Sequence, residues 1–484
     1  MKSAFYLLKV NFMGKSPSWY KLTIIAFLTI NPLLFYFVNP FVAGWAILIQ
    51  FIFTLACALI CYPLQPGGLL ALEAIFIGLT NTDTVFNEVV ANIPTLLLLI
   101  FMVAAIYYLK DILFILITKL FLTIKKKYFL ALVFCVICAS LSAFLDALTL
   151  VAISIAVCFN FYAIYHRVLS NSKENEEEFE EFRGFLRNII MHGVVGTIIG
   201  GTMTIVGEPQ NIMIGTKMGW SFSEFFAHNS VISLPAGIAG VITCFLLEYF
   251  RFPGFRYQMP EKARELITKD YRHKIREITK QTAFLYTLQI IVFILLVFAL
   301  GFHVAEVGLI GIGLIVIVTA FTGRTKEHDL AEAFNNAMPF ATLIIVFFAI
   351  LAVVHDQHLV APLTQWVFTL SGKTQLMALY FVNGTLSFTS DNVFIASIFI
   401  GEVDRAYAAG TFSREWYEKL GVIVNMGTNI PAIATPNGHA ALLFLLTSSL
   451  APMIKLSYFR MFKLTLPYTI VMTGAGAVAV YLFF

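Results

Sequence analysis

Two aspartates stand alone in long apolar stretches, Asp146 in LSAFLDALTLV and Asp391 in SDNVFIASI. An ionised carboxylate at the centre of a bilayer costs about 2.5–3.5 kcal/mol even on the lenient insertion scale, so it is kept where it has a function. Away from bulk water a carboxylate can hold a proton, and in its ionised form it can bind a small hard cation through oxygen. Because the two occupants exclude each other, the aspartates predict exchange of protons for cations.

The composition indicates a polytopic membrane protein. Of the 484 residues, 59% are hydrophobic and 12% are charged, and the mean hydropathy is +0.84, which lies outside ordinary soluble compositions. Apolar segments recur from Tyr20 to Phe484, so we expect an all-α fold whose function lies within the bilayer. Nucleic acid is not an expected partner. The six cysteines lie in apolar segments without a complete zinc-ligand spacing and are expected to be packing residues, and no cofactor is expected.

Loops rich in Lys and Arg orient the chain, because such short loops stay in the cytoplasm. They predict about eleven transmembrane helices and two re-entrant hairpins, with the N-terminus in the cytoplasm and the C-terminus on the periplasmic side. The hairpins carry Asp146 and Asp391. Charge alone also permits another interpretation of the first one, in which 128–145 and 148–165 both cross the membrane fully.

The same topology divides the chain into five parts. They are N-terminal scaffold helices (1–127), a first set of transport elements (128–250), a basic cytoplasmic connection (251–281), the scaffold helices of the second half (282–372), and a second set of transport elements with the last helix (373–484).

Each aspartate is followed by a similar crossing. GGTMTIVGEPQNIMIG follows the first and MGTNIPAIATPNGHAAL the second; both contain Gly-Thr, then small or β-branched residues, then Pro and Asn. Pro209 and Pro436 lack a backbone donor, so the helices should break there, over 207–211 and 431–438. The two aspartate segments start from opposite sides of the membrane. Paired hairpins and broken helices of opposite orientation are typical of an inverted-repeat secondary transporter with its site at the midplane.

The helix breaks and their neighbours supply further candidate ligands. Backbone carbonyls freed at the breaks, next to Gly207 and Gly438, would surround a cation with oxygen. Side-chain amides and hydroxyls add to them, although Ser and Thr often bond helix carbonyls instead. These candidates are Asn211, Asn392, Asn437, Ser142, Thr149, Ser390 and Thr435.

Four other isolated polar residues require separate interpretation. Glu208, inside the first break, is either a third titrating group or a cap of the following half-helix. His439, after the second Pro-Asn pair, is either a pH sensor or a hydrogen-bonded structural imidazole, and we favour the second. Glu73 and Asp356 border apolar segments and are expected at the membrane interface.

Several long motifs, among them CYPLQPGGLLALEAIFIG, LSAFLDALT, VGEPQNI, SDNVF and ATPNGHAALLFLLTS, resemble the NhaB family of bacterial sodium/proton antiporters, within the wider ion-transporter superfamily. The resemblance implies electrogenic exchange of Na⁺ or Li⁺ for H⁺ across the bacterial inner membrane, with Asp146 and Asp391 handling Na⁺. It also implies a homodimer in which a transport domain slides against a scaffold. His439 stands where the family would have glutamine, so no family role transfers to its side chain.

Three other functions are weaker interpretations. A sodium-coupled symporter of dicarboxylates or other anions is the nearest, but both hairpins carry an acid, and acids repel anions. A cation channel would place acidic rings on a symmetric pore axis rather than two unlike sites in one chain. A membrane enzyme would need a nucleophile and base or a metal-ligand set, which the apolar segments lack.

Overall fold

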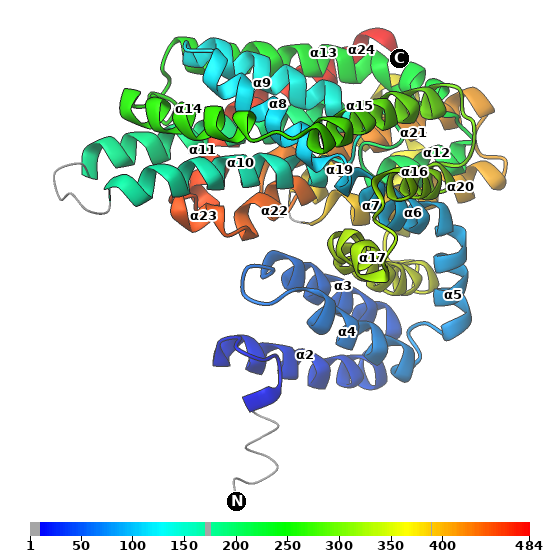
Figure 1. The fold of residues 1–484 in the computed structure, drawn as a ribbon. Coiled ribbons are helices and arrows are strands. Elements are labelled where there is room, and N and C mark those ends of the chain that lie inside the picture. The colour runs from blue at the N-terminus through cyan, green and yellow to red at the C-terminus, as the bar shows by residue number, and fades with distance from the viewer. Residues whose placement is uncertain (1–9, 170–175, 389) are drawn as a thin grey trace, which may run out of the picture.

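The computed structural model describes residues 10–169, 176–388 and 390–484, and the first nine residues of the expected N-terminal scaffold lie outside this range (Figure 1). All regular secondary structure in the described part is helical. The first half begins with the helices α2 (Ser18–Phe37), α3 (Pro40–Ala56), α4 (Leu64–Ile77), α5 (Thr82–Ala91), α6 (Ile93–Leu97), the π-helical turn η1 (Leu98–Met102), α7 (Val103–Tyr107) and α8 (Lys110–Thr123).

The elements that follow in the first half contain Asp146 and the first Pro-Asn motif. They are α9 (Lys127–Ser142), α10 (Ala147–Leu169), α11 (Glu176–Gly201), α12 (Pro209–Met218) and α13 (Phe222–Tyr249). The basic connection then includes a helix of its own, α14 (Glu261–Arg276), which is amphipathic and carries basic residues in its last turn.

The second half begins after α14. It consists of α15 (Lys280–Gly301), α16 (Val307–Thr322), α17 (Glu327–Asp356), α18 (Ala361–Thr369), α19 (Gly372–Ser387), α20 (Asn392–Ala408), α21 (Arg414–Asn429), the 3-10 turn η3 (Pro431–Ala434), α22 (Ala440–Thr447), α23 (Leu450–Met453) and α24 (Tyr458–Phe483). In Figure 1, α2, α3 and α4 lie together near the N-terminus, and α17 packs across α3, α4 and α5.

Length and composition qualify six helices in the described part to cross a bilayer, or seven when the pair 82–91 and 93–107, bent by 62°, is taken as one span. Shorter apolar helices are α3, α4, α9 and α16. A polytopic α-helical membrane protein is therefore confirmed. The expected number of about eleven crossings and the two re-entrant hairpins remain predictions.

Glycines allow the central helices of each half to approach closely. A Cβ on Gly196 or Gly200 of α11 would collide with the backbone of α9 at Cys135 or Ala139. In the second half, a Cβ on Gly427 of α21 would lie 2.9 Å from the carbonyl oxygen of Tyr380 in α19. Backbone contact of this kind is typical of membrane helices. Lipid provides little hydrophobic driving force between them, and small residues let the backbones approach closely enough for favourable van der Waals contact. Both halves use it beside their helix breaks.

The halves also pack on each other. Helix α13 lies against α24, α10 against α22, and α12 against α20. An ion pair between Lys217 Nζ and Asp404 Oδ2, 3.2 Å apart, joins α12 to α20. The two breaks are therefore held close to each other, and each lies beside the aspartate segment of the other half.

Candidate ion-binding site

Asp146 is the residue immediately before α10 and is 1% exposed. Its Oδ2 accepts hydrogen bonds from the backbone N–H of Thr149 at 3.1 Å and from the Thr149 hydroxyl at 3.4 Å. The next residue, Ala147, donates its N–H to the carbonyl oxygen of Gly207 in the first break, at 3.4 Å. Asp146 therefore caps α10 and lies beside the break.

Asp391 has the same position in the second half. It is the N-cap of α20, and its Oδ1 accepts from the N–H groups of Val393 at 2.9 Å and Phe394 at 3.4 Å. It is 6% exposed. The sequence did not predict that both aspartates would cap helices. Capping offsets part of the cost of burying a carboxylate, because the N-terminal end of a helix stabilises negative charge.

The first break spans 202–208, which corrects the expected position of 207–211. Pro209 is the first residue of α12, and Asn211 is also helical. Proline is tolerated there because the first N–H groups of a helix have no intrahelical acceptor. Gly207 lies in the break, where a Cβ would collide with the backbone of Gly201. The second break lies between Asn429 and Ala440, includes η3, and contains Pro436 as expected over 431–438.

A threonine in each break bonds the turn that precedes the aspartate of the same half. Thr204 Oγ1 donates to the carbonyl oxygen of Ala143 at 2.7 Å, and Thr435 Oγ1 donates to that of Phe388, also at 2.7 Å. Gly438 lies close by, because a Cβ there would be 2.6 Å from the carbonyl oxygen of Ser387. The Thr435 hydroxyl, expected as a ligand, thus donates to a carbonyl.

Glu208 brings the two halves together. It is 2% exposed, occupies the N-cap position of α12, and interacts electrostatically with both Asp146 and Asp391. Its Oε1 lies 3.4 Å from Nε2 of His439, the N-cap of α22, although the two atoms are not aligned as a hydrogen bond. Four helix N-termini, each preceded by a titratable residue, therefore lie around one buried region; the side chains of Asp146, Asp391 and His439 accept backbone N–H groups there, whereas that of Glu208 does not.

The hydrogen bond to Nδ1 of His439 indicates which ring nitrogen carries the proton. Nδ1 accepts from the N–H of Ala441 at 3.4 Å and so carries no proton, which leaves the proton of the neutral ring on Nε2, facing Glu208. Asn211 is fixed in a similar way. Its Nδ2 donates to the carbonyl oxygens of Gly201 at 2.7 Å and Thr204 at 2.6 Å, which satisfies part of the interrupted backbone.

Comparison of the chain with known proteins identifies its family. The model of the family described as "Bacterial Na+/H+ antiporter B (NhaB)" matches residues 1–484. The chain belongs to the NhaB family. Relatives named "Na(+)/H(+) antiporter NhaB" include proteins of Yersinia enterocolitica (50% identical over 483 residues, 97% of this chain and 92% of the relative), Pasteurella multocida (49% over 484 residues, 97% and 94%) and Pseudomonas putida (49% over 480 residues, 96% and 96%). The predicted family is thus confirmed, and with it a family of transporters rather than enzymes.

The NhaB fold contains a partly open cavity of about 800 Å³ that reaches Asp391. Its lining includes Asp391, Asn437 and Thr149, and also Lys110 and Asp111 from the start of α8. Asp146 and Glu208 do not line it. Of the two aspartates, therefore, only Asp391 is in contact with the cavity.

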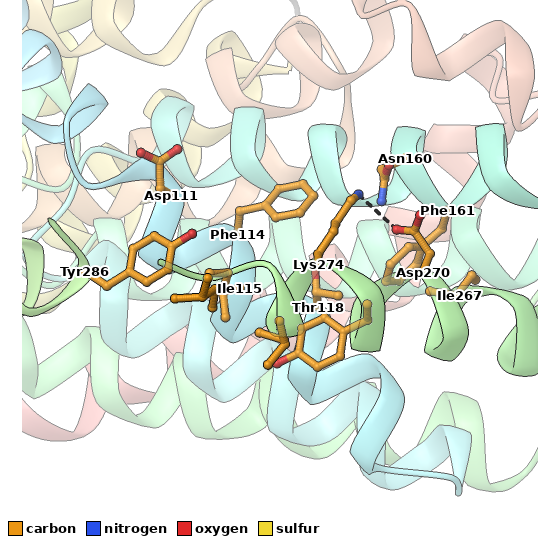
Figure 2. Close-up of a pocket in the computed structure, with 13 residues that line it drawn as sticks. Asp111, Phe114, Ile115, Thr118, Asn160, Phe161, Ile267, Asp270, Lys274 and Tyr286 are labelled. Atoms are coloured by element: carbon orange, nitrogen blue, oxygen red, sulfur yellow. Dashed lines mark ion pairs between the residues drawn. The ribbon is translucent and has the colours of Figure 1, made fainter. Parts of the chain in front are cut away.

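A smaller pocket of about 250 Å³ lies among α8, α10, α14 and α15 (Figure 2). Asp111 lies at one end and the ion pair of Lys274 and Asp270, 2.9 Å apart, at the other. The side chains of this pair are 52% and 36% exposed, so water screens their interaction. None of the site residues predicted from the sequence lines this pocket, and we assign it no part in ion binding.

The remaining candidates are distributed as follows. The hydroxyls of Ser142 and Ser390 are buried and make no hydrogen bond within the described part of the chain. Ser387, also buried and unbonded, was missed, although its spacing of four residues from Asp391 repeats that of Ser142 from Asp146. Asp356 is exposed and accepts from Thr80, and Glu73 is half-buried and accepts from Asn31.

Proposed function

We propose that the chain exchanges cytoplasmic Na⁺ or Li⁺ for external H⁺ across the inner membrane of a bacterium, at a site formed by Asp146, Asp391 and the two helix breaks. The proximity of three buried acidic residues is the observation that carries this proposal. Gly207, next to Glu208, accepts from Ala147, next to Asp146. Gln210 and Asn392, which follow Glu208 and Asp391, donate to the same oxygen of Asn429. The mutual repulsion of the three acidic groups in a poorly hydrated region has to be offset by positive charge. Protons and a bound Na⁺ supply it as alternatives.

The other ligands would be neutral oxygens near the aspartates. We propose the side chains of Asn211, Asn392 and Asn437, followed by those of Thr149, Ser390 and Thr435, together with carbonyls of the breaks. Within the described residues, no group of three or more His, Cys, Asp or Glu side chains is placed to hold a metal ion. A shell for Na⁺ would therefore draw on amide, hydroxyl and carbonyl oxygens as well as carboxylates, as expected for a hard cation.

Access to the site would alternate between the two sides. The start of α8 follows the fourth expected crossing and lies on the expected cytoplasmic side, so the cavity between Lys110 and Asp391 supports a cytoplasm-facing state. Movement of 128–250 and 373–484 against the other helices, in a homodimer and with net transfer of charge, would then expose the site outside. The cytoplasmic N-terminus and the periplasmic C-terminus complete this proposal.

The alternative, a sodium-coupled anion symporter, is disfavoured by the hydrogen bonds through which Asp391 and Asp146 cap α20 and α10. Anion carriers of this type use free N–H groups at half-helix N-termini to bind substrate carboxylates. Here Asp391 accepts from the first N–H groups of α20, and Asp146 accepts from Thr149 in the first turn of α10. The chain's own carboxylates thus occupy places where an anionic substrate would bind.

Purified protein in liposomes with an imposed pH gradient tests the proposal. Added Na⁺ or Li⁺ is expected to dissipate the gradient, whereas K⁺ or choline is not, and a voltage-sensitive dye is expected to report charge movement. Equal responses to all four cations would exclude selective antiport. Uptake of a labelled dicarboxylate with Na⁺, without proton movement, would favour the symporter instead.

A further inference from the structure

A chain of hydrogen-bonded amides connects both halves of the molecule beside the carboxylates. Its members, all fully buried, are Gln210 of α12, Asn392 of α20, Asn429 and Asn425 of α21, and Asn229 of α13. Gln210 Nε2 donates to Asn429 Oδ1 at 2.5 Å, and Asn392 Nδ2 donates to the same oxygen at 3.1 Å. Asn429 Nδ2 then donates to Asn425 Oδ1 at 2.8 Å, and Asn425 Nδ2 donates to Asn229 Oδ1 at 2.9 Å.

Backbone carbonyls fix the direction of every amide in this chain. Asn429 Nδ2 lies 3.0 Å from the carbonyl oxygen of Asn425, which can only accept, so the nitrogen must be on that side of Asn429. At the far end, Asn229 Nδ2 donates to the carbonyl oxygen of Phe225 at 2.9 Å. Both ends therefore require the same polarity. The Oδ1 of Asn429 must accept, and Gln210 and Asn392 must both present nitrogen to it.

This polarity leaves amide oxygens without partners. Gln210 Oε1, Asn392 Oδ1 and Asn211 Oδ1 are buried and accept no hydrogen bond from the residues that the structure describes. A buried polar group in this state costs about 1–3 kcal/mol. Gln210 follows Glu208 by two residues and Asn392 directly follows Asp391, so both unpaired oxygens belong to the first turns of the helices that these acidic residues precede. Amide oxygens are ligands of the kind that hard cations prefer.

We propose that Gln210 Oε1 is a further ligand of the transported cation and that Asn429 is a positioning residue, which turns the oxygens of Gln210 and Asn392 towards that cation. This inference rests on the proposed function. Asn429 itself offers the ion no oxygen, because its Oδ1 already accepts two N–H groups. Because Asn429 accepts from Gln210 of α12 and from Asn392 of α20, it links ligands from both halves. The cation would then bind most tightly when α12 and α20 lie in the arrangement that allows both hydrogen bonds.

The first test replaces the proposed ligand with a side chain of similar length that has no carbonyl. Gln210→Met is expected to raise the Na⁺ concentration for half-maximal exchange about 10- to 100-fold, the range found when groups around a metal site are lost. The rate at saturating Na⁺ should change much less. Binding of ²²Na⁺ to purified protein measures the same affinity without transport. Gln375→Met is the matched control, since Gln375 is buried in α19 and bonds Val367 and Trp416 instead.

The second test separates positioning from stability. Asn429→Leu removes the shared acceptor and should weaken Na⁺ binding and alter the ratio of Na⁺ to Li⁺ affinity. Asn429→Gln keeps both an accepting oxygen and a donating nitrogen and should retain more of the affinity than Asn429→Leu. A merely structural amide chain predicts lower thermal stability for Asn429→Leu with unchanged affinity in the folded fraction.

The outcomes distinguish this inference from the proposed function. Wild-type protein that binds no Na⁺ would overturn both. Normal Na⁺ binding by the wild type together with an unchanged affinity in Gln210→Met would overturn the inference alone. If Asn429→Leu does not assemble, Gln210→Met still decides, because it leaves the bonds from Asn429 to Asn392 and Asn425 in place.

Discussion

The two halves of the transport region share an architecture but differ in the chemistry at their breaks. In each half an aspartate caps a helix, a serine stands four residues before it, a threonine bonds the turn from the break, and a glycine allows close approach of two helices. The N-cap after the break differs: it is Glu208 in the first half and His439 in the second. The two halves thus share the local geometry around their aspartates, while the acidic groups are distributed two to one.

The halves also differ in access. Asp391 lines the large cavity, whereas Asp146 and Glu208 do not. The first half reaches the cavity near its aspartate only through neighbours such as Thr149, so a cation in the cavity would meet the carboxylate of the second half before those of the first. In the proposed function the two breaks form one site to which each half contributes different groups, and variants placed in matched pairs test this difference.

The largest effects are expected from Asp146→Asn and Asp391→Asn. Each removes a negative charge that a proton or cation neutralises, so each should abolish Na⁺-driven proton movement in liposomes while the protein still assembles. Asp404→Asn is the control on the same helix as Asp391, because Asp404 is partly exposed and pairs with Lys217 at 3.2 Å. A fully active Asp146→Asn protein would remove the first half from the chemistry and leave a site built on Asp391 alone.

Sequence patterns predicted the position of the second break well and that of the first poorly. Pro436 lies inside its break, whereas the residues from Thr202 to Val206 contain no proline and look like continuing apolar helix. The first break forms there because the chain turns back on itself, with Gly207 against Gly201, and because Asn211 bonds the freed carbonyls. These contacts depend on the folded chain and leave no periodic signal.

Tertiary proximity also explains which site residues sequence analysis missed. Asp146, Asp391 and Glu208 could be selected because an acid in an apolar segment is conspicuous. Gln210 and Asn429, 219 positions apart, could not be paired. Each alone is a common neutral side chain, and only their shared hydrogen bond gives the oxygen of Gln210 a direction.

Intermediate effects are expected from the glycines that allow two helices within each half to pack closely. Gly200→Ala places a Cβ against the backbone of Ala139, so a helix must shift at a cost of about 1–3 kcal/mol. Gly427→Ala should cost less, since its Cβ would be 2.9 Å from the carbonyl oxygen of Tyr380. Thermal unfolding in detergent measures both. Gly474→Ala, which meets no atom within 4 Å, is the control, and a melting temperature for Gly200→Ala equal to that of the control would contradict close packing of α11 on α9.

The smallest effect is expected from His439→Gln. The imidazole accepts from Ala441 through Nδ1 and places Nε2 3.4 Å from Glu208, and a glutamine amide offers an accepting oxygen and an N–H group without titrating. Exchange should therefore keep most of its rate and its dependence on pH, whereas Glu208→Gln, which removes a charge next to both aspartates, should slow it. The rate of Na⁺-driven proton movement measured across neutral pH compares the two variants. A displaced pH profile in His439→Gln would show that the imidazole titrates, and the breaks would then be chemically equivalent after all.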